Sequence, residues 1–141
     1  MDSQQMLTSI LHTVQMGQSG IRCVQSKAVR PALRKELQRQ LTEYDTMETE
    51  AKAIATQNHW KISDVPKSVT AMSQFMSNFK LLGGDRDSKI ADMLIQGNTK
   101  GMILGLKNLR QGNRVSDPIR QMALRLIQRE RISIENSESF L

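Results

Sequence analysis

Glu48 is the acidic residue whose position in the sequence is most suggestive of chemistry. It falls close to the apolar face of a predicted helix, between Tyr44 and Ala55, and Gln40 lies near the same face. A carboxylate in such a place needs a hydrogen-bond partner, or its pKa rises because burial disfavours the charged form. We therefore take Glu48, Tyr44 and Gln40 as a candidate buried polar site. Glu48 would be held by Tyr44 or by an arginine of a neighbouring helix, or would bind a metal or substrate.

Other residues with metal-binding or nucleophilic chemistry form no recognisable pattern. The chain has two histidines, His12 and His59, and one cysteine, Cys23. Di-metal sites in four-helix bundles use Glu-x-x-His on two helices, and that motif does not occur here. One cysteine cannot build a cysteine-based zinc site, and no phosphate loop, dinucleotide fingerprint or serine elbow is present. The sequence therefore predicts a non-catalytic protein with no metal and no cofactor.

Basic residues gather in the last third of a chain whose net charge is +6. Four arginines there could neutralise phosphates and are candidate anion-binding residues: Arg114, Arg120, Arg125 and Arg129. No aromatic residue lies between them to stack on bases, so nucleic acid is a possible partner but not the favoured one. Ion pairs with glutamates of the second helix explain the same charges: Glu36, Glu43, Glu48 and Glu50.

Three glycines, Gly97, Gly101 and Gly105, lie four residues apart in the segment 88–111. Each costs about 1 kcal/mol relative to alanine inside a helix, so the strip needs a reason. A strip without side chains lets another backbone come close, and Gly17 of the first helix is a plausible partner for it. Close packing within one chain is the first interpretation. Contact with a second subunit and a flat ligand on the strip are the alternatives.

Helices must position all of these residues. Apolar residues recur at helical spacing over about 3–27, 31–58, 66–82, 88–111 and 118–135, and residues 136–141 should fray. Pro31 suits a first helical turn, Asp85 or Asp87 can cap the fourth helix, and Gly112 can end it. The third helix is shorter than its neighbours, so it could carry the chain back and leave the second and fourth helices parallel. The fourth helix, apolar over more than half its circumference, should be an inner helix.

Several stretches resemble a known group of proteins. They are Met16-Gly17 with Ile21, the region 33–51, and the segment Ser88-Lys-Ile-Ala-Asp-Met-Leu-Ile-Gln-Gly97 with Gly101. The last is similar to the Ser-x-Ile-Ala-Glu-Met-Met-Ile-x-Gly segment of small uncharacterised helical proteins from Gram-positive anaerobic bacteria, generally regarded as ferritin-like in fold. The resemblance implies an intracellular bacterial protein and supplies no activity.

We therefore expect one all-α domain over residues 1–141, a ferritin-like four-helix bundle with a shorter helix in the crossover connection. No secretory leader is evident, and Asp92, Lys100 and Lys107 interrupt the longest apolar run, so we expect a cytoplasmic protein without membrane partners. The first functional hypothesis is a self-associating structural or binding module, a homo-oligomer and most simply a dimer. Binding of an anionic partner through the last helices is the second, and a degenerate ferritin-like metal protein is the third.

Overall fold

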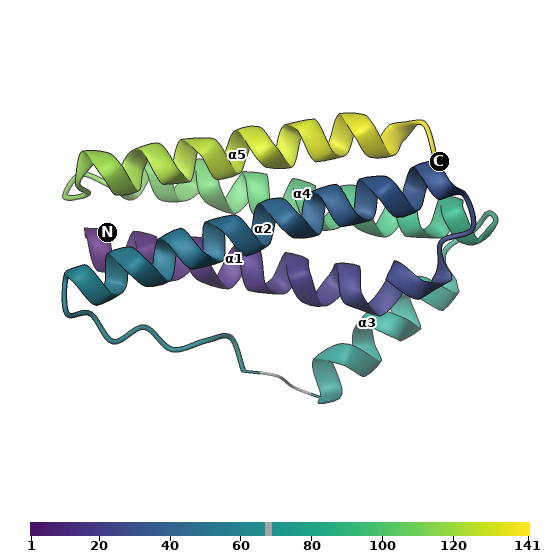
Figure 1. The fold of residues 1–141 in the computed structure, drawn as a ribbon, viewed down its shortest axis with the longest axis horizontal. Helices are drawn as coiled ribbons and strands as arrows, with labels where there is room; N and C mark the ends of the chain where they lie inside the picture. The colour runs from purple at the N-terminus through teal and green to yellow at the C-terminus, as the bar shows by residue number, and fades with distance from the viewer. Residues whose placement is uncertain (67–68) are drawn as a thin grey trace.

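Four long helices lie side by side in the computed structural model, which describes residues 1–66 and 69–141 (Figure 1). They are α1 (Ser3–Val24), α2 (Pro31–Gln57), α4 (Arg86–Gln111) and α5 (Asp117–Glu138). The shorter α3 (Val69–Leu81) precedes α4. The described chain is a helical bundle, as the periodicity predicted.

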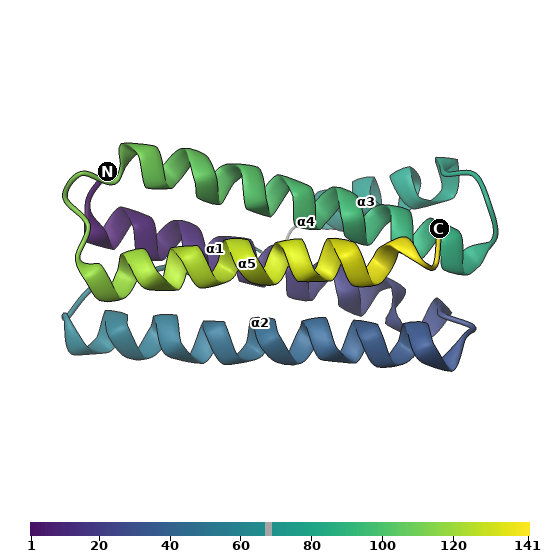
Figure 2. The ribbon, with the colours of Figure 1, turned by 90° about the horizontal axis from the view of Figure 1, so that it is seen from above.

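The direction of the helices follows from the short helix between two long ones. α1 and α5 run one way along the bundle, and α2 and α4 run the other way (Figures 1 and 2). The connection after α2 returns along the outside of the bundle and α3 continues in the same direction, so that α4 begins at the end where α2 began (Figure 1). The parallel course of the second and fourth helices agrees with the prediction.

Local sequence signals account for most of the helix boundaries. The Asp2 side chain accepts a hydrogen bond from the Gln5 backbone N–H at 2.8 Å, and the Gln5 side chain accepts one from the Asp2 N–H at 2.9 Å. Pro31 begins α2, and Asp85 caps α4 by accepting from the Ser88 N–H at 2.8 Å.

Asp87 does not cap α4, although it was the other candidate. Its carboxylate accepts hydrogen bonds from the backbone N–H groups of Val29 (2.8 Å) and Arg30 (3.0 Å) and from Arg30 Nε (3.1 Å). It thereby joins the turn between α1 and α2 to the start of α4. Burial opposes its charge, but these donors outweigh burial and lower the pKa of Asp87.

The core is aliphatic and comes from the inward faces of the long helices. Its fully buried side chains include Met6, Leu7, Leu11, Val14, Ile21, Leu33, Leu37, Ile90, Ile119 and Met122. Each buried side chain of this size contributes roughly 1.5–3 kcal/mol through removal from water. This aliphatic core fixes the positions of the few polar groups buried among it.

We expected α4 to be buried over more than half its circumference, but a narrower face of the helix is buried. Ile103, Leu104 and Leu106 are 43%, 45% and 39% exposed, whereas Asn98 and Asn108 are buried. α4 packs on α5 and α1 along a narrow stripe, so apolar residues outside that stripe stay in contact with solvent.

The C-terminal residues are ordered where fraying was expected. α5 continues to Glu138, Ser137 is fully buried, and Phe140 is also buried. The Arg30 guanidinium lies 5.0 Å from the centre of the Phe140 ring. These contacts fix the end of the chain against the turn before α2.

Two other predicted boundaries differ. α1 ends at Val24 and is followed by a short 3-10 turn, Gln25–Lys27, whereas we expected one helix to Lys27. Pro66 precedes the described part of α3, and residues 67–68 lie outside the described residues. We also expect Val69 and Met72 on the apolar face of this helix from their spacing, but their side chains lie outside the described residues.

Candidate binding site

A cavity of about 540 Å³ opens between α1, α3 and α4. This volume lies in the usual range of small-molecule sites, about 300–1,000 Å³. Its walls are mainly apolar and include Ile21, Val24, Phe75, Leu82, Met93 and Leu94. Four buried polar residues also line it: Gln40 and Tyr44 from α2, Asn98 from α4 and Glu130 from α5. We call these four residues the polar cluster.

Three members of the polar cluster bind one another across three helices. Tyr44 Oη donates a hydrogen bond to Glu130 Oε1 at 2.5 Å. Asn98 Nδ2 donates to Glu130 Oε2 at 3.2 Å and to Tyr44 Oη at 3.1 Å. The Glu130 carboxylate is therefore the centre of the cluster, with one donor on each oxygen.

Burial controls the protonation of this centre. Desolvation raises the pKa of Glu130 to about 7, although the hydrogen bonds from Tyr44 and Asn98 oppose the shift and the charge of Glu43 adds to it. Burial, together with the negative charge of Glu130, raises the pKa of Tyr44 well above its usual value. Tyr44 thus keeps its proton and remains the donor, while Glu130 can change its charge near neutral pH.

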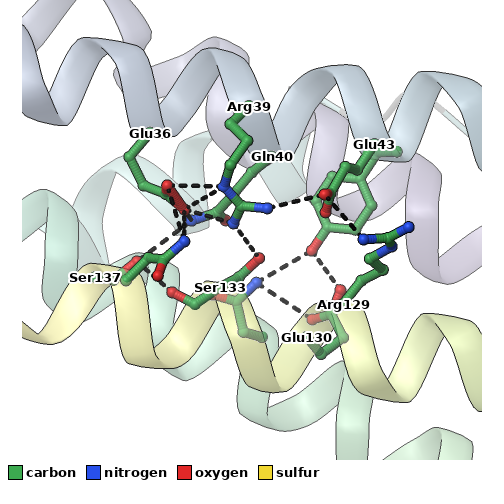
Figure 3. Close-up of polar contacts among 11 residues, drawn as sticks. Glu36, Arg39, Gln40, Glu43, Arg129, Glu130, Ser133 and Ser137 are labelled. Carbon is green, nitrogen blue, oxygen red and sulfur yellow. Dashed lines mark hydrogen bonds and ion pairs between the residues drawn. The ribbon is translucent and has the colours of Figure 1, made fainter.

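The fourth member, Gln40, belongs to a second network between α2 and α5 (Figure 3). Gln40 Nε2 donates to Glu36 Oε1 at 3.2 Å and to Ser137 Oγ at 3.3 Å. Arg39 holds the Glu36 carboxylate through both Nε and Nη2 and also donates to Ser133 Oγ at 3.1 Å. The Gln40 amide nitrogen is fully engaged by these partners.

Two acceptor atoms of the polar cluster have no hydrogen-bond partner among the described residues. They are Gln40 Oε1 and Asn98 Oδ1, in side chains that are 1% and 3% exposed. Rotating either amide would turn its oxygen toward a carboxylate, Glu36 or Glu130, so the observed orientation is the favourable one. An unmet buried acceptor costs about 1–3 kcal/mol, so these two oxygens mark where the polar cluster lacks a hydrogen-bond donor.

Glycines bring the helices close to the polar cluster. A Cβ on Gly101 would lie 3.0 Å from Glu130 Oε2, and one on Gly105 would lie 2.8 Å from Ile127 Cγ1, so both close-pack against α5. Gly17 also close-packs, because a Cβ there would lie 2.5 Å from the Tyr44 ring. Its neighbour is thus Tyr44, where we had expected the glycine strip of α4.

Gly97 differs from the other predicted close-packing glycines. No atom lies within 4 Å of the position its Cβ would take, and Gly97 lines the cavity. The glycine strip therefore does not close-pack along its whole length. At Gly97 the missing side chain leaves space in the cavity.

The structure separates Glu48 from Tyr44 and Gln40. Glu48 accepts from Gln15 Nε2 at 3.0 Å and from Gln18 Nε2 at 3.4 Å, and Lys52 Nζ lies 3.8 Å away. The hydrogen bond from Gln15 is the main reason that the pKa of Glu48 is lowered rather than raised. The carboxylate that meets Tyr44 is Glu130, whose position within the apolar stripe of the last helix was the available signal.

The four candidate anion-binding arginines have different surroundings. Arg125 forms a two-pronged ion pair with Glu50 (3.1 and 2.8 Å), and Arg129 lies 3.4 Å from Glu43. Arg120 donates to the carbonyl of Gly112, and Arg114 is exposed. Two of the four thus make the ion pairs with α2 that were the alternative interpretation.

Metal-binding residues do not gather in the part of the chain that the structure describes. No group of three or more His, Cys, Asp or Glu side chains there could hold a metal ion. The ring nitrogen Nε2 of His12 lies 2.9 Å from the Ser63 carbonyl oxygen. Among the described helices, none combines the length and apolarity needed to cross a membrane.

Comparisons with known proteins give no relative. No family model matches the chain, and no curated protein or solved structure matches it. The resemblance inferred from the sequence thus remains a prediction, and function must be inferred from the cavity itself.

Proposed function

We propose that this protein is a binding module for a small, largely apolar molecule, which occupies the cavity between α1, α3 and α4. One observation carries the proposal: the residues that line an apolar cavity of about 540 Å³ include two buried amides, Gln40 and Asn98, whose oxygens have no partner among the described residues. Ligand sites typically combine apolar walls with a few polar groups that fix orientation. The proposal makes specific the binding role that we expected from the sequence.

Gly97 allows a direct test because it lines the cavity and faces open space. Gly97→Leu should place a side chain in the cavity, since its Cβ would meet no atom of another element within 4 Å, and it also replaces a poor helix former by a good one. We expect the variant to be at least as stable as the wild type and to lose ligand binding. Lys107→Leu on the exposed side of α4 introduces the same side chain outside the cavity and is the matched control.

The assay is the fluorescence of N-phenylnaphthylamine, an uncharged apolar dye, titrated with each protein near neutral pH. Saturable binding by the wild type and by Lys107→Leu, with a loss of at least tenfold in Gly97→Leu, would support the cavity as the site. Equal binding by all three proteins would place the dye elsewhere, and absence of saturable binding by the wild type would contradict the proposed function.

Self-association is a second candidate function, favoured by the apolar residues left exposed on α4 and α5. Ile103 and Leu106 of α4 and Leu124 of α5 are each about two-fifths exposed. Burying these side chains against a second copy would remove apolar surface from water. Sedimentation analysis of wild type and Leu106→Glu tests this: a dimer that the variant disrupts would support it, and a strict monomer at high concentration would contradict it.

We also propose that the bundle is ferritin-like. The parallel course of α2 and α4, with a short helix in the connection between them, supports a ferritin-like arrangement.

An anionic partner is a further proposal. It would bind through Arg114 and Arg120 together with Arg125 and Arg129, which would first have to leave Glu50 and Glu43. Retention on heparin above moderate salt would support such a partner.

A further inference from the structure

We infer that the ligand of this cavity is an amphiphilic amine whose ammonium group lies against Asn98, Gln40 and Glu130 while its hydrocarbon body lies along the apolar walls. This inference rests on the proposed binding function and adds the chemical class of the ligand. In the polar cluster the donor atoms already have partners within the protein, whereas two acceptor atoms have none among the described residues.

Every side-chain donor group of the polar cluster is engaged within the protein. The Tyr44 hydroxyl donates to Glu130, and the Asn98 amide nitrogen donates to Glu130 and Tyr44. The Gln40 amide nitrogen donates to Glu36 and Ser137. A ligand that needs donors, such as a carboxylate or phosphate, would have to displace these bonds.

The acceptors of the polar cluster, in contrast, are in excess. Asn98 Oδ1 and Gln40 Oε1 have no partner among the described residues. The Glu130 carboxylate has about four lone-pair sites but accepts only two hydrogen bonds, one from Tyr44 Oη and one from Asn98 Nδ2. An ammonium group has three donors and no acceptor, which complements this surplus. A hydroxyl would supply a single donor.

The negative charge of Glu130 is a second reason to expect an ammonium group in place of a neutral donor such as a hydroxyl. A buried carboxylate without a counter-charge is costly, and Glu130 has no cation within ion-pair distance among the described residues. Burial raises the pKa of Glu130 to about 7, as expected for such a group. A bound ammonium would supply the missing positive charge inside the cavity.

The other charges of the protein would repel a cationic ligand, so only the polar cluster could attract one. The chain has a net charge of +6, and exposed Lys100 also lines the cavity. Long-range attraction and Lys100 would both favour an anionic ligand. A preference for a cation would thus come from Glu130 and its neighbouring acceptors.

Three ligands of equal chain length test the inference: octylamine, octanol and octanoate, each used to displace N-phenylnaphthylamine. We expect octylamine to displace the dye at a concentration at least about tenfold lower than octanol, since hydrogen bonds to charged groups are the stronger ones. Octanoate should be the weakest. Glu130→Gln should bring octylamine and octanol to within about threefold, whereas Glu135→Gln, an exposed site on the same helix, should keep the difference.

The outcomes separate this inference from the proposed function. If the dye binds and octanol equals octylamine, or octanoate binds best, the cavity binds ligands but the inferred amine is wrong. If the dye does not bind at all, the proposed function fails first. The wild-type comparison alone decides the preference for an amine, so the test does not depend on whether Glu130→Gln folds.

Discussion

Glu130→Gln should change how the stability of the protein depends on pH. The pKa of Glu130 is raised from 4.5 in an unfolded chain to about 7 in the folded protein, a difference of about 2.5 units. At 1.36 kcal/mol per unit this corresponds to about 3 kcal/mol. Tyr44 can still donate to the amide oxygen of the new glutamine, and Asn98 can rotate to accept from its nitrogen.

The sign follows from proton binding in the two states. Between about pH 4.5 and about pH 7 the folded protein binds more protons at Glu130 than the unfolded chain does, so this residue makes the free energy of unfolding fall as pH rises. The contribution is most favourable below pH 4.5 and is lost once pH exceeds the folded pKa. Glu130→Gln removes this dependence and therefore gains stability relative to the wild type as pH rises.

Urea unfolding of both proteins at several values from about pH 4 to about pH 8.5 measures this directly. The difference in unfolding free energy between variant and wild type should move by about 3 kcal/mol in favour of the variant across that range. Glu135→Gln, which changes an exposed carboxylate, should show no comparable movement. A difference that stays constant with pH would mean that Glu130 is not buried as described.

Three further perturbations test the packing around this site. Gly17→Ala should lower the free energy of unfolding by about 1–3 kcal/mol despite better helix propensity, because its Cβ would meet the ring of Tyr44; calorimetry would measure this, and a stabilised variant would contradict the close contact. Asp87→Ala should cost about 1–3 kcal/mol near neutral pH, and the loss should shrink below about pH 4 as the wild-type carboxyl becomes protonated, which urea titrations at two pH values would reveal. Arg125→Gln should change stability by less than about 1 kcal/mol, because its ion pair with Glu50 is half exposed; a larger loss in thermal unfolding would contradict this assignment as a surface pair.

The sequence alone determined the helical elements and their caps. Apolar residues at helical spacing, Pro31 at a helix start and Asp85 before the fourth helix are local signals, and the structure places helix boundaries at or near them. Those signals also identified Tyr44 and Gln40 as polar residues facing inward, which they are. Local patterns succeed here because helix periodicity and capping depend on residues only a few positions apart.

Only the tertiary structure decided which polar residues meet. Glu48 and Glu130 both interrupt apolar helix faces in the sequence, but Glu130 reaches Tyr44 and Glu48 is met by glutamines of α1. Likewise Gly97 and Gly101 are equivalent by spacing, yet one lines a cavity and the other contacts α5. The rotation of each helix about its axis and the helices it faces depend on packing between residues far apart in the chain, and that information is not contained in the spacing along any single helix.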